Sequence, residues 1–313
     1  MMTFSRQGYW CPLFFCFVLL LAPANGAQGA PVHYAWTNSP TPTPPYTNWS
    51  TAARTLQDAV DAATGGDVVL ATNGIYALNS SVAGGMSNRV AVRGTITLRS
   101  VNGPATACIL GQGPVGESAV RCAFLSHGAV LDGFTLTNGC TLVGTNSAGR
   151  GGGVYCASSA ERITNCIITG GKASFSGGGI YRGTVKSTTI TNNTALHGAG
   201  AQDAILDNCA VRNNRASLLG GGVYASTLSN CILADNGAGF YVFGNTNFMA
   251  GAGAARSDLT DCIVTRNEAY GPGGGVWDSR LSRCLVATNL ATGDGGGCYG
   301  GIASNCTITA NTG

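Results

Sequence analysis

The chain has 313 residues, only 10% of them charged, with a net charge of +3. A charge this slight and scattered excludes a nucleic-acid-binding protein as the leading interpretation. The chain also contains 48 glycines. Such a composition is unusual for a globular enzyme and natural for a solenoid, whose turns must be tight.

Residues 1–26 are predicted to form a secretory signal peptide. Arg6 supplies the positive charge, residues 10–22 the apolar core and residues 24–26 a small-residue cleavage site. The apolar run of about 13 residues is shorter than the roughly 20 that a membrane-spanning helix needs. We therefore expect an exported protein, secreted or at the cell surface, with no membrane-spanning segment in the mature chain.

Residues 27–66 are predicted to hold an N-terminal strand, a Pro/Thr-rich loop and a helix over 55–63. Leu56, Val60 and Ala63 share one face of that helix. A solenoid has open ends whose apolar core and free strand edges need covering. We expect this helix to be such a cap.

A repeat of about 22 residues runs from Gly151 to the end of the chain. A fixed period of this size indicates a solenoid, and its short strands and many glycines indicate a β-solenoid. We predict an all-β, single-stranded parallel β-helix over 67–313, regular from residue 151. The blocks Gly-Gly-Gly-(Val/Ile)-(Tyr/Trp), one with Cys298 at the fourth place, stand at 151–155, 177–181, 220–224, 273–277 and 295–299.

The second part of the repeat is Cys-x-(Ile/Val/Leu)-x-x-Asn. By strand alternation the cysteine shares the inward side of the aliphatic residue, and we expect buried free thiols, with disulfides as the alternative. Cys108, Cys122, Cys140 and Cys156 lie outside this row and are the better disulfide candidates. The cysteine ladder comprises Cys166, Cys209, Cys231, Cys262, Cys284 and Cys306.

The asparagines of the repeat are interpreted as a structural ladder. Asparagine tolerates the left-handed conformation that a corner requires, and stacked amides can hydrogen-bond from rung to rung. The ladder comprises Asn193, Asn214, Asn236, Asn267, Asn289 and Asn311.

The pairing of Gly-Gly-(Gly/Ala)-(Ile/Val) with an apolar-x-x-Asn element resembles the repeats of chlamydial-type polymorphic outer membrane proteins. More broadly, it resembles the right-handed parallel β-helices of the pectin lyase-like superfamily, and residues 49–70 are similar to the N-terminal part of many secreted bacterial β-helix proteins. The resemblance implies a right-handed fold, which parallel connections also favour. It does not imply one activity, because the superfamily includes lyases, hydrolases, tailspikes and adhesins.

Two features depart from the polymorphic-protein pattern. Those proteins have Phe before x-x-Asn, where this chain has residues such as Ile190 and Val211, and they carry a C-terminal membrane β-barrel that this sequence does not show. The sequence stops on a ladder position, so we expect the natural chain to continue beyond Gly313.

No catalytic constellation is predicted, and we expect neither a metal nor a cofactor. The acids of the repeat region do not form the paired-aspartate motifs of polysaccharide hydrolases. His197 is interpreted as a variable loop residue, and Arg256, Arg266, Arg280 and Arg283 as solvated side chains. The acids are Asp203, Asp207, Asp235, Asp258, Asp261, Asp278, Asp294 and Glu268.

An aromatic row is the candidate ligand-binding feature. It should face outward by strand alternation, with interruptions at Gln202 and Ala255. Exposed rings can bind sugar faces or a partner. The alternative is ring packing between rungs, beneath an aromatic insertion at 240–248. The row comprises Tyr155, Tyr181, Tyr224, Trp277 and Tyr299.

The sequence leaves three candidate functions open. The first is a non-catalytic adhesion or binding scaffold that binds polysaccharide or cell-surface glycans. The second is a polysaccharide lyase or glycoside hydrolase, with its site near the irregular rungs or the loops at 139–150 and 237–250. The third is a structural stalk for a further C-terminal domain. The oligomeric state stays open.

Overall fold

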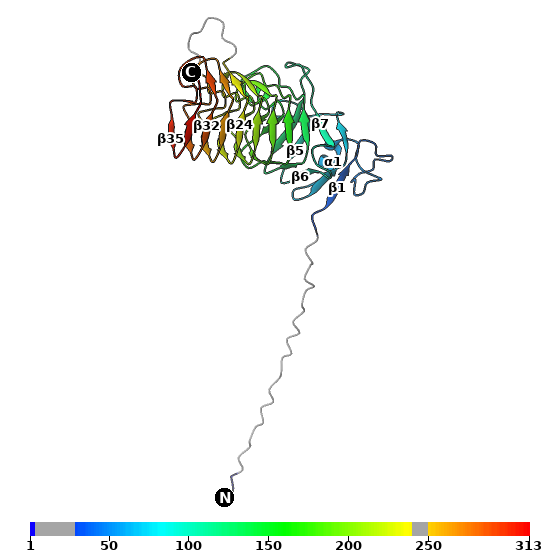
Figure 1. Ribbon diagram of the computed structural model, residues 1–313. Coiled ribbons are helices and arrows are strands. Elements are labelled where there is room, and N and C mark those ends of the chain that lie inside the picture. The colour runs from blue at the N-terminus through cyan, green and yellow to red at the C-terminus, as the bar shows by residue number, and fades with distance from the viewer. Residues whose placement is uncertain (4–28, 240–249) are drawn as a thin grey trace. The chain divides into compact units, whose positions relative to one another are not determined.

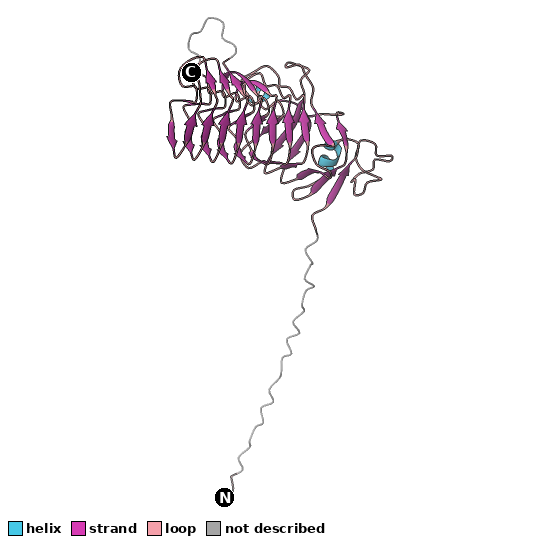
Figure 2. Cartoon of the chain, in the orientation of Figure 1, coloured by secondary structure: helices cyan, strands magenta, loops and turns pink. Residues whose placement is uncertain are grey.

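The computed structural model describes residues 1–3, 29–239 and 250–313. Pro31–Gly313 forms one compact unit, in which short strands stack into long parallel sheets (Figures 1 and 2). The core of the predicted signal peptide and the aromatic insertion at 240–248 lie outside the described residues.

Four sheets, A to D, form the sides of the solenoid in the described part of the chain. Sheet A contains β1 (Val32–Ala35), β2 (Val68–Ala71), β6 (Thr97–Ser100), β9 (Val130–Asp132), β12 (Arg162–Thr164), β15 (Thr184–Lys186), β19 (Ile205–Asp207), β23 (Thr227–Ser229), β27 (Asp258–Thr260), β31 (Arg280–Ser282) and β35 (Ile302–Ser304). Sheet B contains β3 (Gly74–Tyr76), β7 (Ala107–Leu110), β10 (Thr135–Thr137), β13 (Ile167–Thr169), β16 (Thr189–Thr191), β20 (Ala210–Arg212), β24 (Ile232–Ala234), β28 (Ile263–Thr265), β32 (Leu285–Ala287) and β36 (Thr307–Thr309). Sheet C contains β4 (Ser81–Ala83), β5 (Met86–Arg93), β8 (Arg121–Ser126), β11 (Val154–Cys156), β14 (Ile180–Tyr181), β18 (Ala201–Gln202), β22 (Val223–Tyr224), β26 (Ala254–Ala255), β30 (Val276–Trp277) and β34 (Cys298–Tyr299). Sheet D contains β17 (Thr194–His197), β21 (Arg215–Leu219), β25 (Gly237–Ala238), β29 (Glu268–Ala269) and β33 (Leu290–Ala291).

The corners between the sheets are made by single residues with positive φ. In one rung these are Gly198, Asp203, Asn208 and Asn213, with φ of 53°, 53°, 53° and 54°. The left-handed conformation is accessible to Gly and tolerated by Asn and Asp, so these residues suit the corners. These corners are five residues apart, and the next rung begins with Gly220, seven residues after Asn213, so this rung spans 22 residues.

The core is a continuous cluster of buried side chains between the sheets. Residues 21, 22 or 31 apart pair in register along sheet A, so Leu206, Leu228, Leu259 and Leu281 lie in one buried row. Removal of this apolar surface from water is the main favourable contribution to folding.

The ladder cysteines point inward as predicted, but they lie at a corner, just before a strand of sheet B, and not within the strand. Cys231 directly precedes β24, and its Sγ lies 3.1 Å from the Ser229 carbonyl oxygen. Cys166, Cys209, Cys231, Cys262 and Cys284 are buried, and Cys306 is half-buried. Their thiols fill the space inside this corner.

Every cysteine in the described residues is a free thiol, including the four disulfide candidates outside the ladder. Cys156 of β11 pairs in register with Leu125 of β8, three residues beyond Cys122, so these two thiols do not face each other. Burial raises the pKa of Cys122 and of Cys166 to about 12, which keeps both protonated.

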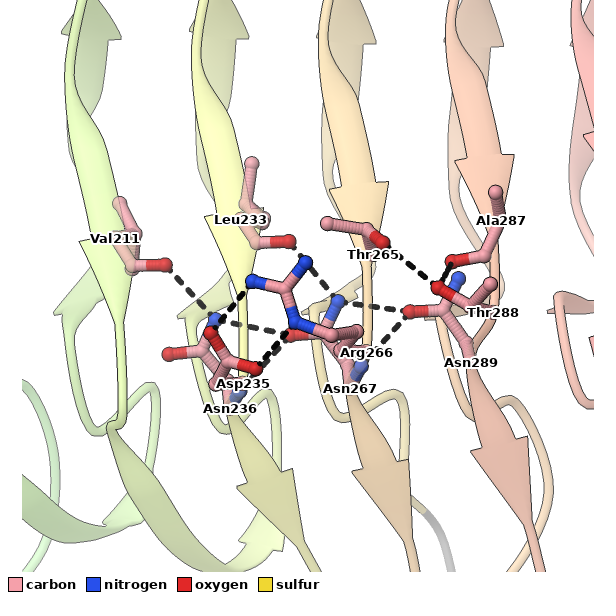
Figure 3. A network of polar contacts seen from close by, with 10 residues as sticks. All are labelled: Val211, Leu233, Asp235, Asn236, Thr265, Arg266, Asn267, Ala287, Thr288 and Asn289. Carbon is pink, nitrogen blue, oxygen red and sulfur yellow. Dashed lines mark hydrogen bonds and ion pairs between the residues drawn. The ribbon is translucent and has the colours of Figure 1, made fainter.

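The asparagine ladder is buried just beyond the other end of the sheet B strands, and Figure 3 shows three of its members. Asn236 donates from Nδ2 to the Val211 carbonyl oxygen (2.9 Å) and to Asn267 Oδ1 (3.0 Å), and its Oδ1 accepts from Asn214 N and Nδ2 (both 3.0 Å). This amide therefore joins three rungs. Asn193, Asn214, Asn267 and Asn289 are buried in the same row, and Asn311 is half-buried.

Of the two reasons for expecting asparagine here, the stacked amides do hydrogen-bond from rung to rung, but the ladder asparagines are not left-handed. The left-handed residue is the one before the ladder asparagine, as at Asp235 (φ 58°) and Arg266 (φ 52°). Asparagine is needed instead because a buried amide can donate and accept at once, which satisfies the corner's backbone groups.

The N-terminal helix α1 (Leu56–Ala62) begins after Thr55, whose side chain accepts a hydrogen bond from Asp58 N at 3.1 Å. Leu56 is buried in the core. Gln57 Oε1 accepts from the Ala91 backbone N of β5 at 2.8 Å, and its Nε2 donates to the Ala91 carbonyl oxygen at 3.4 Å. The helix thus meets the apolar core and the backbone of a sheet C strand together. A single 3₁₀ turn, η1 (Ser147–Gly149), precedes β11.

Replacement of a ladder asparagine should destabilise the solenoid. In Asn236→Ala, Asn214 N, the Val211 carbonyl and the Asn267 amide lose partners, so we expect a loss of about 2–4 kcal/mol in the free energy of unfolding. Chemical denaturation followed by circular dichroism measures it. Thr227→Ala, at an exposed strand residue of the same rung, is the control and should change stability by less than about 0.5 kcal/mol.

The thiols should be countable. Residues 27–313 contain eleven cysteines, which is the thirteen of the whole chain minus Cys11 and Cys16. We expect eleven thiols per chain to react with a thiol reagent in denaturant without reductant, and most to react slowly in the native protein because their Sγ atoms are buried. A count lower by two or four would instead show disulfides.

Candidate binding face on sheet C

The five predicted aromatic residues occupy one register position of sheet C. Tyr155 pairs with Tyr181, Trp277 pairs with Tyr299, and Gln202 and Ala255 interrupt the row on either side of Tyr224. The residue directly before the aromatic residue, such as Ile180 or Val276, points into the core. The row therefore lies on the outer side of the sheet.

The first glycine of each triple-glycine block makes a tight corner just before a strand of sheet C. Gly220 has φ of 63°, and a Cβ added to it would lie 2.2 Å from the Val223 carbonyl oxygen and 3.0 Å from Tyr224 Cβ. The corner therefore folds back tightly beneath the aromatic residue. A residue with a side chain would be both sterically blocked and strained there.

At the N-terminal end of the row the rings stack on one another. The Tyr155 and Tyr181 ring centroids are 5.3 Å apart with an interplanar angle of 28°, and Phe124 extends the stack at 5.6 Å and 5° from Tyr155. Rings stacked along the solenoid axis cover each other's faces and leave mainly their edges for contact. This part of the row fits the packing alternative.

Tyr181 is only 1% exposed, so the expectation of an exposed ring is wrong at this residue, although it lies in the predicted row. Arg150 donates to Tyr181 Oη at 2.7 Å, and its guanidinium carbon lies 4.9 Å from the Tyr181 ring centroid. Arg182 lies over the same ring at 5.1 Å. These two side chains cover the tyrosine.

A polar cluster, defined as Arg150, Ser176, His197 and Gln202, flanks this part of the row. Arg150 pairs with Ser176 and Ser176 with His197 on successive rungs, while Gln202 belongs to the aromatic register position. Within the described part of the chain, Arg150 Nε, Ser176 Oγ, His197 Nδ1 and Gln202 Oε1 are buried without a hydrogen-bond partner. Unpaired buried polar atoms cost free energy, so this cluster is locally destabilising.

His197 is not the variable loop residue that the sequence indicated, because it ends β17. Its ring lies 5.6 Å from both the Phe175 and the Tyr224 ring centroids. Burial lowers the pKa of His197, so the imidazole is favoured in its neutral form.

Arg121 and Phe124, both in β8, were missed by sequence reasoning. Arg121 is fully buried and donates to the carbonyl oxygens of Gly151 (2.8 Å), Arg150 (2.7 Å) and Ser147 (2.8 Å) and to Asn88 Oδ1 (2.8 Å). Burial lowers its pKa to about 9. No triple glycine precedes this strand, so the repeat gave no signal for either residue.

Further along the row the rings are less covered than Tyr181. Tyr224 and Trp277 are both half-buried. The Arg256 guanidinium carbon lies 5.0 Å from the Trp277 ring, and its Nη1 donates to Tyr224 Oη at 3.3 Å. Ala255 separates Tyr224 from Trp277, so these two rings do not stack as Tyr155 and Tyr181 do.

A hollow of about 440 Å³ lies beside this end of the row. Arg256 Nε lies 3.6 Å from Asp278 Oδ2, and Arg280 Nη1 lies 3.9 Å from Asp258 Oδ1. Two carboxylates and two guanidinium groups therefore alternate around it. The four arginines interpreted as solvated are exposed but each is paired with an aspartate on a neighbouring rung.

Asp261 and Asp207 are also held by neighbouring side chains. Arg283 hydrogen-bonds Asp261 at 2.7 Å and lowers its pKa, and Asn230 and Ser229 lower the pKa of Asp207. Carboxylates held ionised are poor proton donors. Among the described residues, no three His, Cys, Asp or Glu side chains are placed to hold a metal ion.

Comparison with known proteins agrees with this architecture. A family model described as a right-handed β-helix region matches residues 128–291. The chain belongs to the right-handed β-helix family. This establishes the handedness that topology and resemblance favoured. No curated protein sequence matches the chain.

Several solved structures are similar. Pectate lyase Pel9A has a TM-score of 0.54 at 13% identity, over 89% of this chain and 78% of that one. Pectin methylesterase PemA from Erwinia chrysanthemi has 0.46 at 10%, over 91% and 93%, and the Dettilon tailspike protein 0.47 at 12%, over 90% and 62%. The first of these shows that the β-helix has the fold of a pectate lyase. The resemblance to polymorphic outer membrane proteins stays a prediction.

The half-buried His197 should make stability depend on pH. Its pKa is lowered on folding, so the unfolded chain binds more protons and stability falls as pH drops below the ordinary histidine value of about 6.5. We expect the denaturation midpoint of His197→Gln to change less between pH 7 and pH 5 than that of the wild type. His127→Asn, at an exposed left-handed position, is the control and should keep the wild-type slope. An unchanged slope in His197→Gln would contradict the assignment.

Proposed function

We propose that this protein is an exported, non-catalytic binding scaffold whose sheet C face binds carbohydrate at its C-terminal end. The observation that carries the proposal is the position of Tyr224, Trp277 and Tyr299 in one register row, broken at Ala255, with Arg256 against two of the rings. Arg256 lies over one face of Trp277, and the apolar side of a sugar would pack against the other face.

Charged groups beside the rings support recognition of a sugar. The Arg256 guanidinium sits between Tyr224 Oη and Asp278, where it can donate to sugar hydroxyl or carboxyl groups. Asp278 and Asp258 lie 3.6 and 3.9 Å from Arg256 and Arg280 and can accept from sugar hydroxyl groups.

A polysaccharide-cleaving enzyme is the second candidate. The hollow that contains Asp258, Asp278, Arg256 and Arg280 supports it, because it gathers two carboxylates and two cations beside the aromatic row. It does not coincide with the loops at 139–150 and 237–250 where the sequence placed such a site. The similarity to a pectate lyase concerns the fold and leaves the reaction open.

Export is part of the same proposal. It rests on the charge, apolar run and small residues of 1–26. No helix among the residues that the structure describes is long and apolar enough to cross a bilayer. The proposed domain limits remain 1–26, 27–66 and 67–313, and a stalk with a further C-terminal domain remains the third candidate.

Loss of the accessible rings should weaken carbohydrate binding. We expect Tyr224→Ala and Trp277→Ala each to reduce affinity about tenfold or more for whichever member of a panel of acidic and neutral polysaccharides binds residues 27–313, because a buried aromatic contact contributes about 1.5–2 kcal/mol. Calorimetry measures the binding, and the same samples are assayed for reducing ends and unsaturated ends.

Tyr270→Ala is the control, since Tyr270 is an exposed tyrosine, at 42%, that lies outside the row. Its affinity should equal that of the wild type. Release of products would overturn the scaffold and establish the enzyme, with Asp258→Asn and Asp278→Asn as the next variants. Absence of binding to every polysaccharide would contradict a carbohydrate ligand.

A further inference from the structure

A second hollow lies at the opposite, N-terminal part of the solenoid. It has a volume of about 440 Å³ and is lined by Trp36, Trp49, Thr72 and Asn73. Trp36 follows β1 and Thr72 follows β2, and Thr72 N donates to the Ala35 carbonyl oxygen at 3.1 Å. The hollow therefore lies where the first two strands of sheet A end. Its volume is within the range of small-molecule sites.

The repeat is broken at this point. On later rungs a left-handed residue such as Asn208 turns the chain from sheet A directly toward sheet B. On the first rung the chain instead leaves β1 as a long loop and returns to Ala53, which pairs with Ala35. Solenoids commonly carry binding residues on such insertions.

The loop is held in place by hydrogen bonds. Thr43 N donates to the Thr51 carbonyl oxygen at 3.0 Å, Arg54 Nε donates to the Ser39 carbonyl oxygen at 2.8 Å, and Asn48 Oδ1 accepts from Thr51 N at 3.0 Å. A loop ordered before binding loses less entropy when a ligand arrives.

Trp49 stands exposed on this ordered loop. Its ring meets Tyr34 edge-on, with centroids 4.5 Å apart and an interplanar angle of 67°. The contact fixes the orientation of the indole, yet Trp49 remains 38% exposed. Indole surface left in water, held by its neighbours and lining a hollow with a second indole, is the pattern of a recognition site.

The polar groups of the hollow are neutral. Asn102 Nδ2 donates to Asn73 Oδ1 at 2.8 Å, which orients the Asn73 amide so that its Nδ2 can donate to a ligand hydroxyl. Thr72 adds a hydroxyl, and none of the four lining residues is charged. The electron-rich faces of indoles attract the C–H groups of a sugar ring, and the amide and hydroxyl pair with its hydroxyl groups.

We propose that this hollow is a second binding site, for a neutral hexopyranose or pentopyranose unit of an oligosaccharide. The indoles of Trp36 and Trp49 contact the sugar ring, and Asn73 bonds its hydroxyls. The site shares no residue with the sheet C face, so each can be tested without the other.

The tryptophans of the chain allow a direct measurement. Besides Trp10 of the signal segment, the chain has Trp36, Trp49 and Trp277. In a Trp277→Phe variant of residues 27–313, tryptophan emission therefore reports on the hollow alone. We expect a saturable change in emission with at least one of cellopentaose, xylopentaose, mannopentaose and maltopentaose.

Substitutions in the hollow should remove that signal. On the same background, Trp49→Ala should weaken the calorimetric affinity at least tenfold, and Asn73→Ala several-fold. Trp49→Phe, which keeps a ring against Tyr34, should retain measurable binding and shows that a loss in Trp49→Ala does not come from a collapsed loop. Tyr270→Ala should bind as the parent does.

Three results would overturn the proposal. They are no saturable change with any of the four oligosaccharides, an unchanged affinity in Trp49→Ala, and equal or tighter binding of the acidic probe pentagalacturonate, since the lining has no charge to recognise it. Because Trp277 is absent from the assay, failure here leaves the sheet C proposal standing. Failure of the sheet C variants likewise leaves the hollow standing.

Discussion

The structure depends on the constraint that every rung turns at equivalent places. Single left-handed residues end the short strands, as at Asp203, Asn208 and Asn213. Because each strand restarts at the same place, residues on successive rungs fall in register and parallel backbone hydrogen bonds run along the whole solenoid. An insertion does not disturb the register when it begins and ends at corners. Asn236 and Asn267 are 31 residues apart, yet the asparagine ladder continues from one to the other.

The same register limits what the surface can bind. Tyr155 and Tyr181 lie on adjacent rungs and stack on each other, and Arg150 lies over the Tyr181 ring. These contacts cover ring faces that a ligand would need. A ligand needs a ring face that no neighbour covers. Both proposed binding sites accordingly lie where the repetition fails, at the Ala255 gap beside Trp277 and at the loop that carries Trp49.

Register also shapes the charge pattern. Like charges stacked at rung spacing would repel each other, and the chain instead alternates sign, with Asp235 facing Arg266 and Asp261 facing Arg283. These exposed pairs each contribute little to stability, but they neutralise most aspartates of the repeat. The polar cluster around His197 differs from these ion pairs. Its buried polar atoms have no hydrogen-bond partner, and burial lowers the pKa of His197.

Much of the architecture was predictable because the same sequence pattern recurs on successive rungs of the solenoid. The glycine blocks, the buried asparagines and the helix at 55–63 were read from spacing and side-chain type, and the structure places the asparagines in one hydrogen-bonded row and begins α1 at Leu56. The errors were geometric. The cysteines lie at a corner, and the left-handed residue precedes each ladder asparagine, because period alone does not say where within a repeat the chain turns.

The candidate sites divide in the same way. The sequence by itself determined that Tyr155, Tyr181, Tyr224, Trp277 and Tyr299 share one row, since equal spacing forces equal position on successive rungs. Only the tertiary structure decided which of them a ligand can reach, because exposure depends on residues distant in sequence, such as Arg150 over Tyr181. The hollow of Trp36 and Trp49 likewise exists only once the returning loop is laid against β1, a contact that no repeat encodes.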